Sequence, residues 1–252
     1  MWITVFYKKN YFRLSLYYTG DNPDQCKHMP RHARIDIAGE IYHVINRANA
    51  KSWIFESSGD RTAVIESMGE TLQKVPIDIF AFCIMSNHWH FAVRPRADGD
   101  MGKFFGKFTQ KVTQRWHKFH QTVGSGHLFQ GRFKTFLVQT DPYFIQLMKY
   151  IEANPLRAGL VSKAEDWAWC SLSLRQENIE LANTILTPWP IDIPAGYIDM
   201  VNQPMPKVFL EQVRGSVMRG RPFGDNRWVE EKISEYGLEH TIRQPFRPQK
   251  LK

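Results

Sequence analysis

A predicted β-hairpin between residues 77 and 93 constrains the fold of this chain more than any other stretch. The run from Ile77 to Met85 is apolar apart from one aspartate, and such a strand lies buried at the centre of a sheet. A turn follows at Ser86 and Asn87, and the return strand covers residues 88–93. Side chains alternate between the two faces of a strand, so His88 and His90 point to one face and Trp89 to the other.

The two histidines on one strand face are candidate metal ligands. A neutral imidazole offers one nitrogen lone pair, and two imidazoles side by side can bind the same divalent ion. The alternative is a pair of half-exposed histidines on a surface strand. The pattern alone leaves both interpretations open.

The segments around the hairpin predict an α+β fold. Residues 40–46 alternate apolar and polar side chains as a first strand does, and residues 135–138 form a fourth strand. Helices are predicted over residues 61–74, after Gly59 and Asp60, and over residues 100–120 and 142–154, the last with Asp141 as its N-cap. The order strand, helix, strand, strand, helix, strand is the split βαβ plan of ferredoxin-like domains, here with an antiparallel sheet and an added helix.

The predicted helix over residues 100–120 has an apolar face and a basic face. The apolar positions are Phe104, Phe105, Phe108, Val112, Trp116 and Phe119, and the basic ones are Lys103, Lys107, Lys111, Arg115 and Lys118. No Asp or Glu occurs between residues 101 and 135. An unbroken positive stripe favours contact with DNA phosphates, with an ordinary solvated surface as the alternative.

The charge and the cysteine pattern restrict the partners and the compartment. The net charge of +8 and the sequence pI near 9.4 favour a polyanionic partner. The three cysteines are far apart and form no CxxC pair, so neither a disulfide framework nor a structural zinc site is indicated. A cytoplasmic protein fits best, and no apolar run is long enough for a membrane span.

The chain divides into three predicted parts. Residues 1–28 are expected to be a loose arm or to precede the natural start, residues 29–174 the main domain, and residues 175–252 a helical, basic region. Within the last part, residues 176–187 are expected to be irregular and residues 243–252 disordered. Two helices over residues 205–218 and 225–236 flank a turn with Arg219 and Arg221, which suggests a helix-turn-helix that contacts DNA.

The helix over residues 142–154 carries Tyr150 and Asn154 four positions apart, so they share one face. Near the histidine strand, a phenol and an amide oxygen supply a nucleophile and a third metal ligand. The alternative for Tyr150 is a core tyrosine whose hydroxyl is hydrogen-bonded.

Three ordered motifs together resemble those of the single-tyrosine HUH transposases, and most of all the REP-associated tyrosine transposases of the IS200-like type. The motifs are Ser86 to His90, Gly126 to Lys134 and Tyr150 to Val161. The resemblance covers residues 29–174, with a weaker match near residues 215–243. It implies a bacterial, nucleoid-associated enzyme that cleaves and joins single-stranded or hairpin DNA with Mg²⁺ or Mn²⁺. Relatives of this kind are dimers that exchange the tyrosine helix, whereas the longer C-terminus here suggests a monomer, so both states stay open.

Carried over to this chain, the resemblance assigns His88 and His90 to the metal, Tyr150 to the nucleophile and Asn154 to the third-ligand position. His43 matches a family position as a supporting or DNA-contacting residue, or it is a buried structural histidine. DNA contacts are expected from His127, Phe129, Arg132 and Lys134, with a core position as the alternative for Phe129. The metal and Lys149 or Arg157 could provide a positive field for the tyrosine, and Arg157 is also expected to contact DNA.

Two other functions remain to be separated from strand transfer. One is a metal-dependent nuclease that uses water and not Tyr150. The other is a non-catalytic DNA-binding protein with the same fold.

Overall fold

The computed structural model describes residues 34–242, which contain one four-stranded antiparallel sheet in the order β2-β3-β1-β4. Its strands are β1 (Tyr42–Arg47), β2 (Ile77–Ile84), β3 (His88–Pro95) and β4 (Lys134–Leu137). β3 lies between β1 and β2, and β1 lies between β3 and β4. Each helical crossover is therefore split by another strand, which confirms the predicted ferredoxin-like α+β plan.

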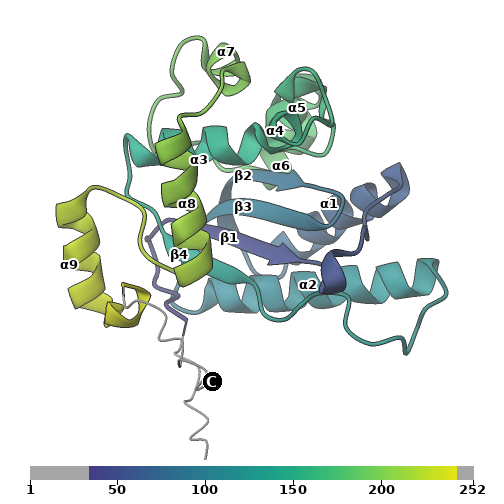
Figure 1. Ribbon diagram of the computed structural model, residues 1–252. Coiled ribbons are helices and arrows are strands. Elements are labelled where there is room, and N and C mark those ends of the chain that lie inside the picture. The colour runs from purple at the N-terminus through teal and green to yellow at the C-terminus, as the bar shows by residue number, and fades with distance from the viewer. Residues whose placement is uncertain (1–33, 243–252) are drawn as a thin grey trace, which may run out of the picture. The chain divides into compact units, whose positions relative to one another are not determined.

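Helices cover both faces of this sheet (Figure 1). α1 (Ser58–Leu72) and α2 (Asp100–Phe119) lie on one face, and α3 (Tyr143–Glu152) lies on the other. The remaining α-helices are α4 (Asn154–Arg157), α5 (Ser171–Glu177), α6 (Ile179–Ile185), α7 (Tyr197–Asn202), α8 (Lys207–Arg219) and α9 (Asn226–Tyr236). The 3₁₀ turns are η1 (Asn49–Lys51), η2 (Ala164–Asp166) and η3 (Glu239–Thr241).

The face beneath α1 and α2 holds an aromatic core. Trp89 is fully buried there, as its place in the strand alternation predicts, and it stacks on Phe105 with ring centroids 5.4 Å apart. Phe91 and Phe108 pack edge-on against the same rings. This face contributes stability by burying large apolar surfaces.

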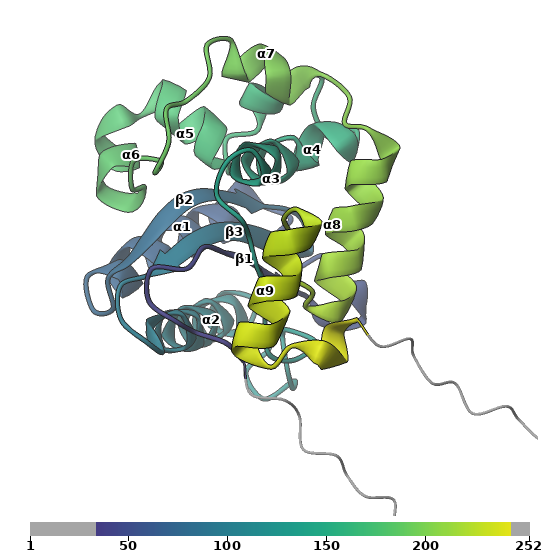
Figure 2. The same ribbon diagram turned by 90° about the vertical axis from the view of Figure 1, so that its left-hand side faces the viewer.

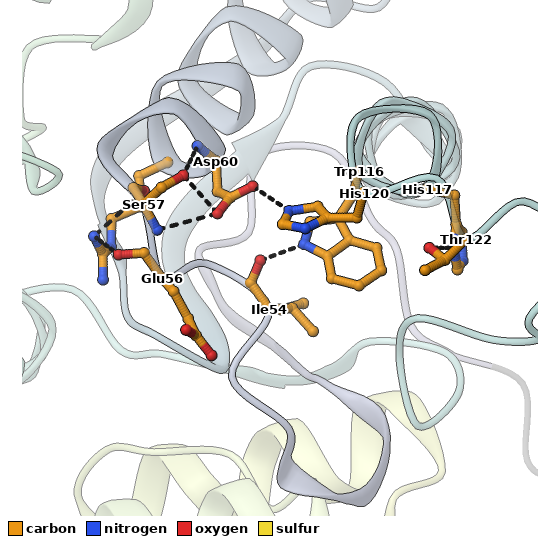
Figure 3. A network of polar contacts seen from close by, with 9 residues as sticks. Ile54, Glu56, Ser57, Asp60, Trp116, His117, His120 and Thr122 are labelled. Carbon is orange, nitrogen blue, oxygen red and sulfur yellow. Dashed lines mark hydrogen bonds and ion pairs between the residues drawn. The ribbon is translucent and has the colours of Figure 1, made fainter.

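A polar network joins the start of α1 to the end of α2 (Figure 3). Ser57 and Asp60 form a capping box at the N-terminus of α1, and the other oxygen of Asp60 lies 2.7 Å from Nε2 of His120. The indole N–H of Trp116 donates to the carbonyl of Ile54. The loop before α1 is thereby fixed, and its Ile54 N–H donates to the Ser86 carbonyl at 2.9 Å, which supports the β2–β3 turn.

The opposite face carries α3 and part of the C-terminal region. Phe144, Leu147 and Met148 of α3 are fully buried against the sheet. α8 adds Phe209 and Val213 to the same core, and the two views show α8 running across the direction of α3, from the side of α7 toward β4 (Figure 2). The C-terminal helices thus help to enclose the face that carries His88 and His90.

Three local predictions for the helices are wrong. Phe119 is 72% exposed because the last turn of α2 extends past the sheet. Asp141 is not an N-cap: α3 begins at Tyr143, Pro142 occupies the cap position without a side-chain hydrogen bond, and the Asp141–Pro142 peptide is cis. Residues 176–187 are mostly helical, in α5 and α6, since helices this short show too little periodicity in the sequence to be recognised.

The C-terminal helices α8 and α9 occur close to their predicted positions but do not form a helix-turn-helix. Val213 of α8 packs in the α3-side core, whereas Val229 and Ile233 of α9 pack in the core of the α1 and α2 side. The two helices therefore lack the shared core of such a module. α7 was not predicted.

The predicted arm over residues 1–28 and the predicted tail over residues 243–252 lie outside the described residues. The domain boundary at residue 174 stays a prediction. Between residues 34 and 242, no helix is long and apolar enough to cross a membrane.

Candidate active site

His88 and His90 lie at the start of β3, on the sheet face that α3 covers. His90 is 2% exposed and His88 is half-buried. Their rings are perpendicular, with centroids 5.0 Å apart. The strand alternation therefore brings the two imidazoles together as predicted.

Each of the two rings has its Nδ1 atom in a hydrogen bond. Nδ1 of His88 lies 2.7 Å from Oδ1 of Asn87, and Nδ1 of His90 lies 2.8 Å from Nε2 of His43. Among the described residues, neither Nε2 atom of the pair has a hydrogen-bond partner. The Nε2 atoms are thus the ones left for another ligand.

Burial keeps both histidines neutral near pH 7. It lowers the pKa of His88 to about 4, with smaller contributions from the positive charges of Arg47 and Arg157. Burial is also the main reason that the pKa of His90 lies well below its usual value. Neutral rings are a requirement for binding a metal through a lone pair.

Tyr150 meets the histidines from α3. Its ring lies edge-on to His90, with centroids 5.8 Å apart, and to His43, at 6.2 Å. The side chain is 8% exposed, and its hydroxyl makes no hydrogen bond to another described residue. Tyr150 thus belongs to the buried core of this face, as the core alternative expects, but within residues 34–242 its hydroxyl lacks the hydrogen-bond partner that this alternative also expects.

Arg157 of α4 ties Tyr150 to Asn154. Its guanidinium lies over the tyrosine ring, 4.3 Å from the centroid, and donates to the Tyr150 carbonyl at 2.8 Å. It also donates to Oδ1 of Asn154 at 3.0 Å. A positive charge is therefore fixed against the phenol ring, as expected from the sequence.

The two imidazoles fit a divalent ion better than Asn154 does. Asn154 is 8% exposed, and its oxygen already accepts a hydrogen bond from a cation. Its Nδ2 is buried without a partner in the described part of the chain. No group of three His, Cys, Asp or Glu side chains within residues 34–242 is arranged to hold a metal, so a complete site would need ligands from outside that set, such as DNA or water.

His43 lies directly beneath the site on β1. Its side chain has no exposed surface, and burial lowers the pKa of its ring to about 3. A fully buried ring bonded to His90 argues against a DNA contact and fits both a supporting role and a buried structural histidine.

The basic stripe of α2 lies on the other face of the sheet, away from Tyr150. Glu70 of α1 pairs with both Lys111 and Arg115, and Asp100 pairs with Lys103 at 3.1 Å. Lys107 is exposed and has no ion pair within the described chain. After Asp100 the sequence of α2 has no acidic residue, and Glu70 of α1 partly compensates for this by pairing with Lys111 and Arg115.

The segment between α2 and β4 is split between surface and core. His127, Arg132 and Lys134 are exposed, whereas Phe129 is 6% exposed and contacts Trp89, with centroids 6.4 Å apart. The core alternative is therefore favoured for Phe129. The Gln130 N–H donates to the Arg47 carbonyl at 3.0 Å, so this segment runs beside the end of β1 nearest His88.

Arg219 and Arg221 are exposed on either side of Gly220, which ends α8 in a left-handed conformation with φ of 74°. This turn lies along the outer edge of β4, where the Phe223 N–H donates to the Leu137 carbonyl at 2.8 Å. The pair is thus at the sheet edge, apart from Tyr150.

Two arginines near the histidines escaped the sequence analysis. Arg47 is directly opposite His88 in the β1–β3 register and is exposed; the alternation of His43, Ile45 and Arg47 on one face could have revealed it. Arg214 of α8 is close enough to Arg157 for their positive charges to repel each other. Burial is the main reason that the pKa of Arg157 is lowered, and the charge of Arg214 lowers it further. No local pattern signals Arg214, because its position depends on where α8 crosses the sheet.

Comparisons with known proteins agree with this fold. A solved structure described as a REP-associated tyrosine transposase bound to a REP hairpin superposes with a TM-score of 0.50 at 18% identity, over 66% of this chain and 94% of the other. A Haemophilus influenzae protein described as a REP-associated tyrosine transposase is 24% identical over 110 residues. That match spans 40% of this chain and 62% of the relative.

The fold defines the chain as an α+β protein whose histidines and tyrosine meet on one face of the sheet. The family model for IS200-like transposases matches residues 38–154, a range that contains His43, His88, His90, Tyr150 and Asn154. This match covers less than half of the chain. It confirms the resemblance to IS200-like transposases found in the sequence.

Proposed function

We propose that this chain cleaves single-stranded DNA with Tyr150 as the nucleophile and transfers the cleaved strand through a 5′-phosphotyrosine intermediate. The observation that carries the proposal is the edge-on packing of Tyr150 against His90, 5.8 Å between centroids, on the sheet face that also holds His88. A nucleophile and a pair of candidate metal ligands on one face are what such a reaction requires.

The bond changes balance without an external energy source. Tyr150 loses its phenolic proton, its oxygen bonds to phosphorus, and the bond from phosphorus to the 3′ oxygen breaks to leave a 3′-hydroxyl. A second 3′-hydroxyl can then attack the phosphotyrosine and release the phenol. The number of phosphoester bonds is unchanged in each step.

Residues of this chain would assist the attack by position and charge. Arg157, fixed against the Tyr150 ring, favours the phenolate as it forms. Arg47 beside His88 and Arg214 near Arg157 add positive charge for the DNA backbone. His88 and His90 would hold Mg²⁺ or Mn²⁺ through Nε2, and the bound ion would supply Lewis-acid polarisation of the scissile phosphate.

The substrate we propose is hairpin DNA with a single-stranded flank. The net charge of +8 supports a nucleic-acid partner. The solved relative is described as bound to a REP hairpin, and its fold matches the fold of this chain over 66% of the residues.

We further propose that Tyr150 serves the histidines of its own chain. Glu152, two residues later on α3, is fully buried and accepts hydrogen bonds from Ser171, Arg175 and Tyr197 at 2.5, 2.7 and 2.7 Å. These partners come from α5 and α7, so α3 is anchored within the chain. Exchange of the helix between two copies would break a buried ion pair, which favours a monomer.

Trapping the covalent intermediate tests the proposal. The full-length chain is incubated with a 5′-labelled and, separately, a 3′-labelled hairpin oligonucleotide and Mn²⁺ or Mg²⁺, and the products are separated on a denaturing gel. The wild-type protein should retain only the 3′-labelled fragment, and Tyr150→Phe should retain none while still binding the oligonucleotide. Tyr143→Phe, which changes the other tyrosine of α3, is the matched control and should form the adduct.

Other outcomes identify the alternatives. Metal-dependent cleavage by Tyr150→Phe would indicate a nuclease that uses water. Binding by the wild-type protein without cleavage would indicate a non-catalytic DNA-binding protein. Either result overturns the proposal.

A further inference from the structure

The two candidate ligand histidines are held by different neighbours at the same ring atom. Nδ1 of His88 lies 2.7 Å from Oδ1 of Asn87, which precedes it in the β2–β3 turn. Nδ1 of His90 lies 2.8 Å from Nε2 of His43, which comes from the adjacent strand β1. Neither neighbour would need to touch an ion bound by the pair.

The Asn87 contact fixes where the proton of His88 resides. The amide nitrogen of Asn87 donates to the Lys51 carbonyl at 3.0 Å, so the amide oxygen is the atom that faces His88. An amide oxygen only accepts, so Nδ1 of His88 must carry the hydrogen. In a neutral imidazole this leaves the lone pair on Nε2.

The His43 contact can do the same for His90. Both rings are at most 2% exposed, so each is bound to the other without competition from water. When Nδ1 of His90 donates, Nε2 of His43 accepts, and the lone pair of His90 lies on Nε2. The proton of His43 then sits on its Nδ1, which is buried and has no partner within residues 34–242.

We propose that Asn87 and His43 are positioning residues that keep a proton on Nδ1 of His88 and His90, so that both Nε2 lone pairs face the same divalent ion. The proposal rests on the metal site of the proposed function. Ligand histidines commonly donate their second N–H to such a partner, and loss of the partner typically weakens metal binding about 10–100-fold. His43 would act through His90, and Asn87 through His88.

Mn²⁺ binding to the full-length chain without DNA tests this separately from activity. Free Mn²⁺ is followed by its electron paramagnetic resonance signal at pH 7.5. His43→Leu and Asn87→Ala should each weaken binding about 10–100-fold. His43→Gln keeps an acceptor near the position of Nε2 and should restore binding to within about threefold of wild type, which a purely structural role of His43 does not predict.

Controls separate the two proposals. His90→Ala should abolish binding, and His120→Gln, which changes a histidine on the other side of the sheet, should bind as wild type does. If wild type binds no Mn²⁺, or if His90→Ala binds it normally, the metal site itself is wrong. If His90→Ala fails to bind but His43→Leu and Asn87→Ala bind normally, only the positioning role is overturned.

Unfolding curves in urea show whether each variant is folded. His43→Leu alters a buried site, whereas Asn87 lies in a surface turn, so Asn87→Ala provides the test even if His43→Leu does not fold. Normal Mn²⁺ affinity of Asn87→Ala contradicts the role of Asn87 regardless of the result at residue 43.

Discussion

The two faces of the sheet are made by the same strands but differ in what they bury. On the α1 and α2 face, Trp89 and Phe91 pack with aromatic residues of α2. On the α3 face, the neighbouring positions of β3 are His88 and His90, which meet Tyr150. The alternation of side chains along β3 thus places an aromatic core on one face of the sheet and a candidate reaction centre on the opposite face.

The polar face depends on the apolar one. A buried histidine or glutamate carries a desolvation cost that must be offset by apolar burial elsewhere in the domain. The aromatic face provides that burial and holds β3 rigid beneath the histidines. The end of the α3 face that carries the histidines can therefore be specified without contributing much to stability, while Phe144, Leu147 and Met148 form an apolar core on the rest of that face.

Adjacent residues of β3 provide the sharpest test of this division. Trp89→Ala should destabilise the protein by about 3–5 kcal/mol, because it leaves a cavity in the aromatic core. His88→Ala, one residue away on the other face, should cost less than about 1 kcal/mol because the ring is half-buried. Urea denaturation measures both values, and equal losses would contradict the division.

The buried histidines should also make the α3 face sensitive to acid. The pKa of His43 is lowered by burial to about 3, while an unfolded histidine has a value of about 6.5. The unfolded chain therefore binds a proton that the folded chain excludes, and stability present above pH 6.5 is lost as the pH falls toward 3.

Between pH 7.5 and pH 5, this one histidine should cost about 2 kcal/mol of stability. His43→Gln has no such group, so its loss over the same interval should be smaller by about that amount. Urea denaturation of both proteins at the two pH values provides the comparison. An identical loss in both would show that His43 is not buried as a neutral ring.

The smallest expected effect concerns the basic stripe on α2, on the far face. Lys107 has no ion pair within residues 34–242, whereas Lys111 is paired with Glu70. Binding of an oligonucleotide weakens with salt, and the slope of the logarithm of the binding constant against the logarithm of the salt concentration counts the phosphate contacts. If the stripe binds DNA, Lys107→Gln should reduce the size of this slope by about 1, and Lys111→Gln by less. Titrations by fluorescence anisotropy at several salt concentrations measure the slopes. Unchanged slopes in both variants would remove the α2 face from the DNA-binding surface.

Patterns within single elements predicted most of this fold. The alternation in β3 placed Trp89 and the histidines on the correct faces, and the helical spacing in α2 identified Phe104, Phe105 and Phe108 as core residues. Turn and cap signals were less useful, as the misplaced N-cap at Asp141 shows. α5 to α7 were missed or misread because six or seven residues are too few for a reliable period.

The candidate site was likewise predictable only where the pattern lies within one element. Spacing in β3 and in the helix predicted over residues 142–154 singled out His88, His90, Tyr150 and Asn154 as candidates, although Asn154 lies in α4 and not in α3. Contacts between distant segments could not be read from the sequence. Glu70 pairs with the stripe of α2, His43 bonds to His90, and Arg214 approaches Arg157 only because the chain folds those segments together.

Mapping the covalent link to DNA by mass spectrometry tests the central claim most directly. The wild-type chain is reacted with hairpin DNA and Mn²⁺, digested with nuclease and protease, and the modified peptide is sequenced. The account predicts a nucleotide attached to Tyr150. Attachment to Tyr143 or to any other residue, or cleaved DNA without a modified peptide, would contradict it.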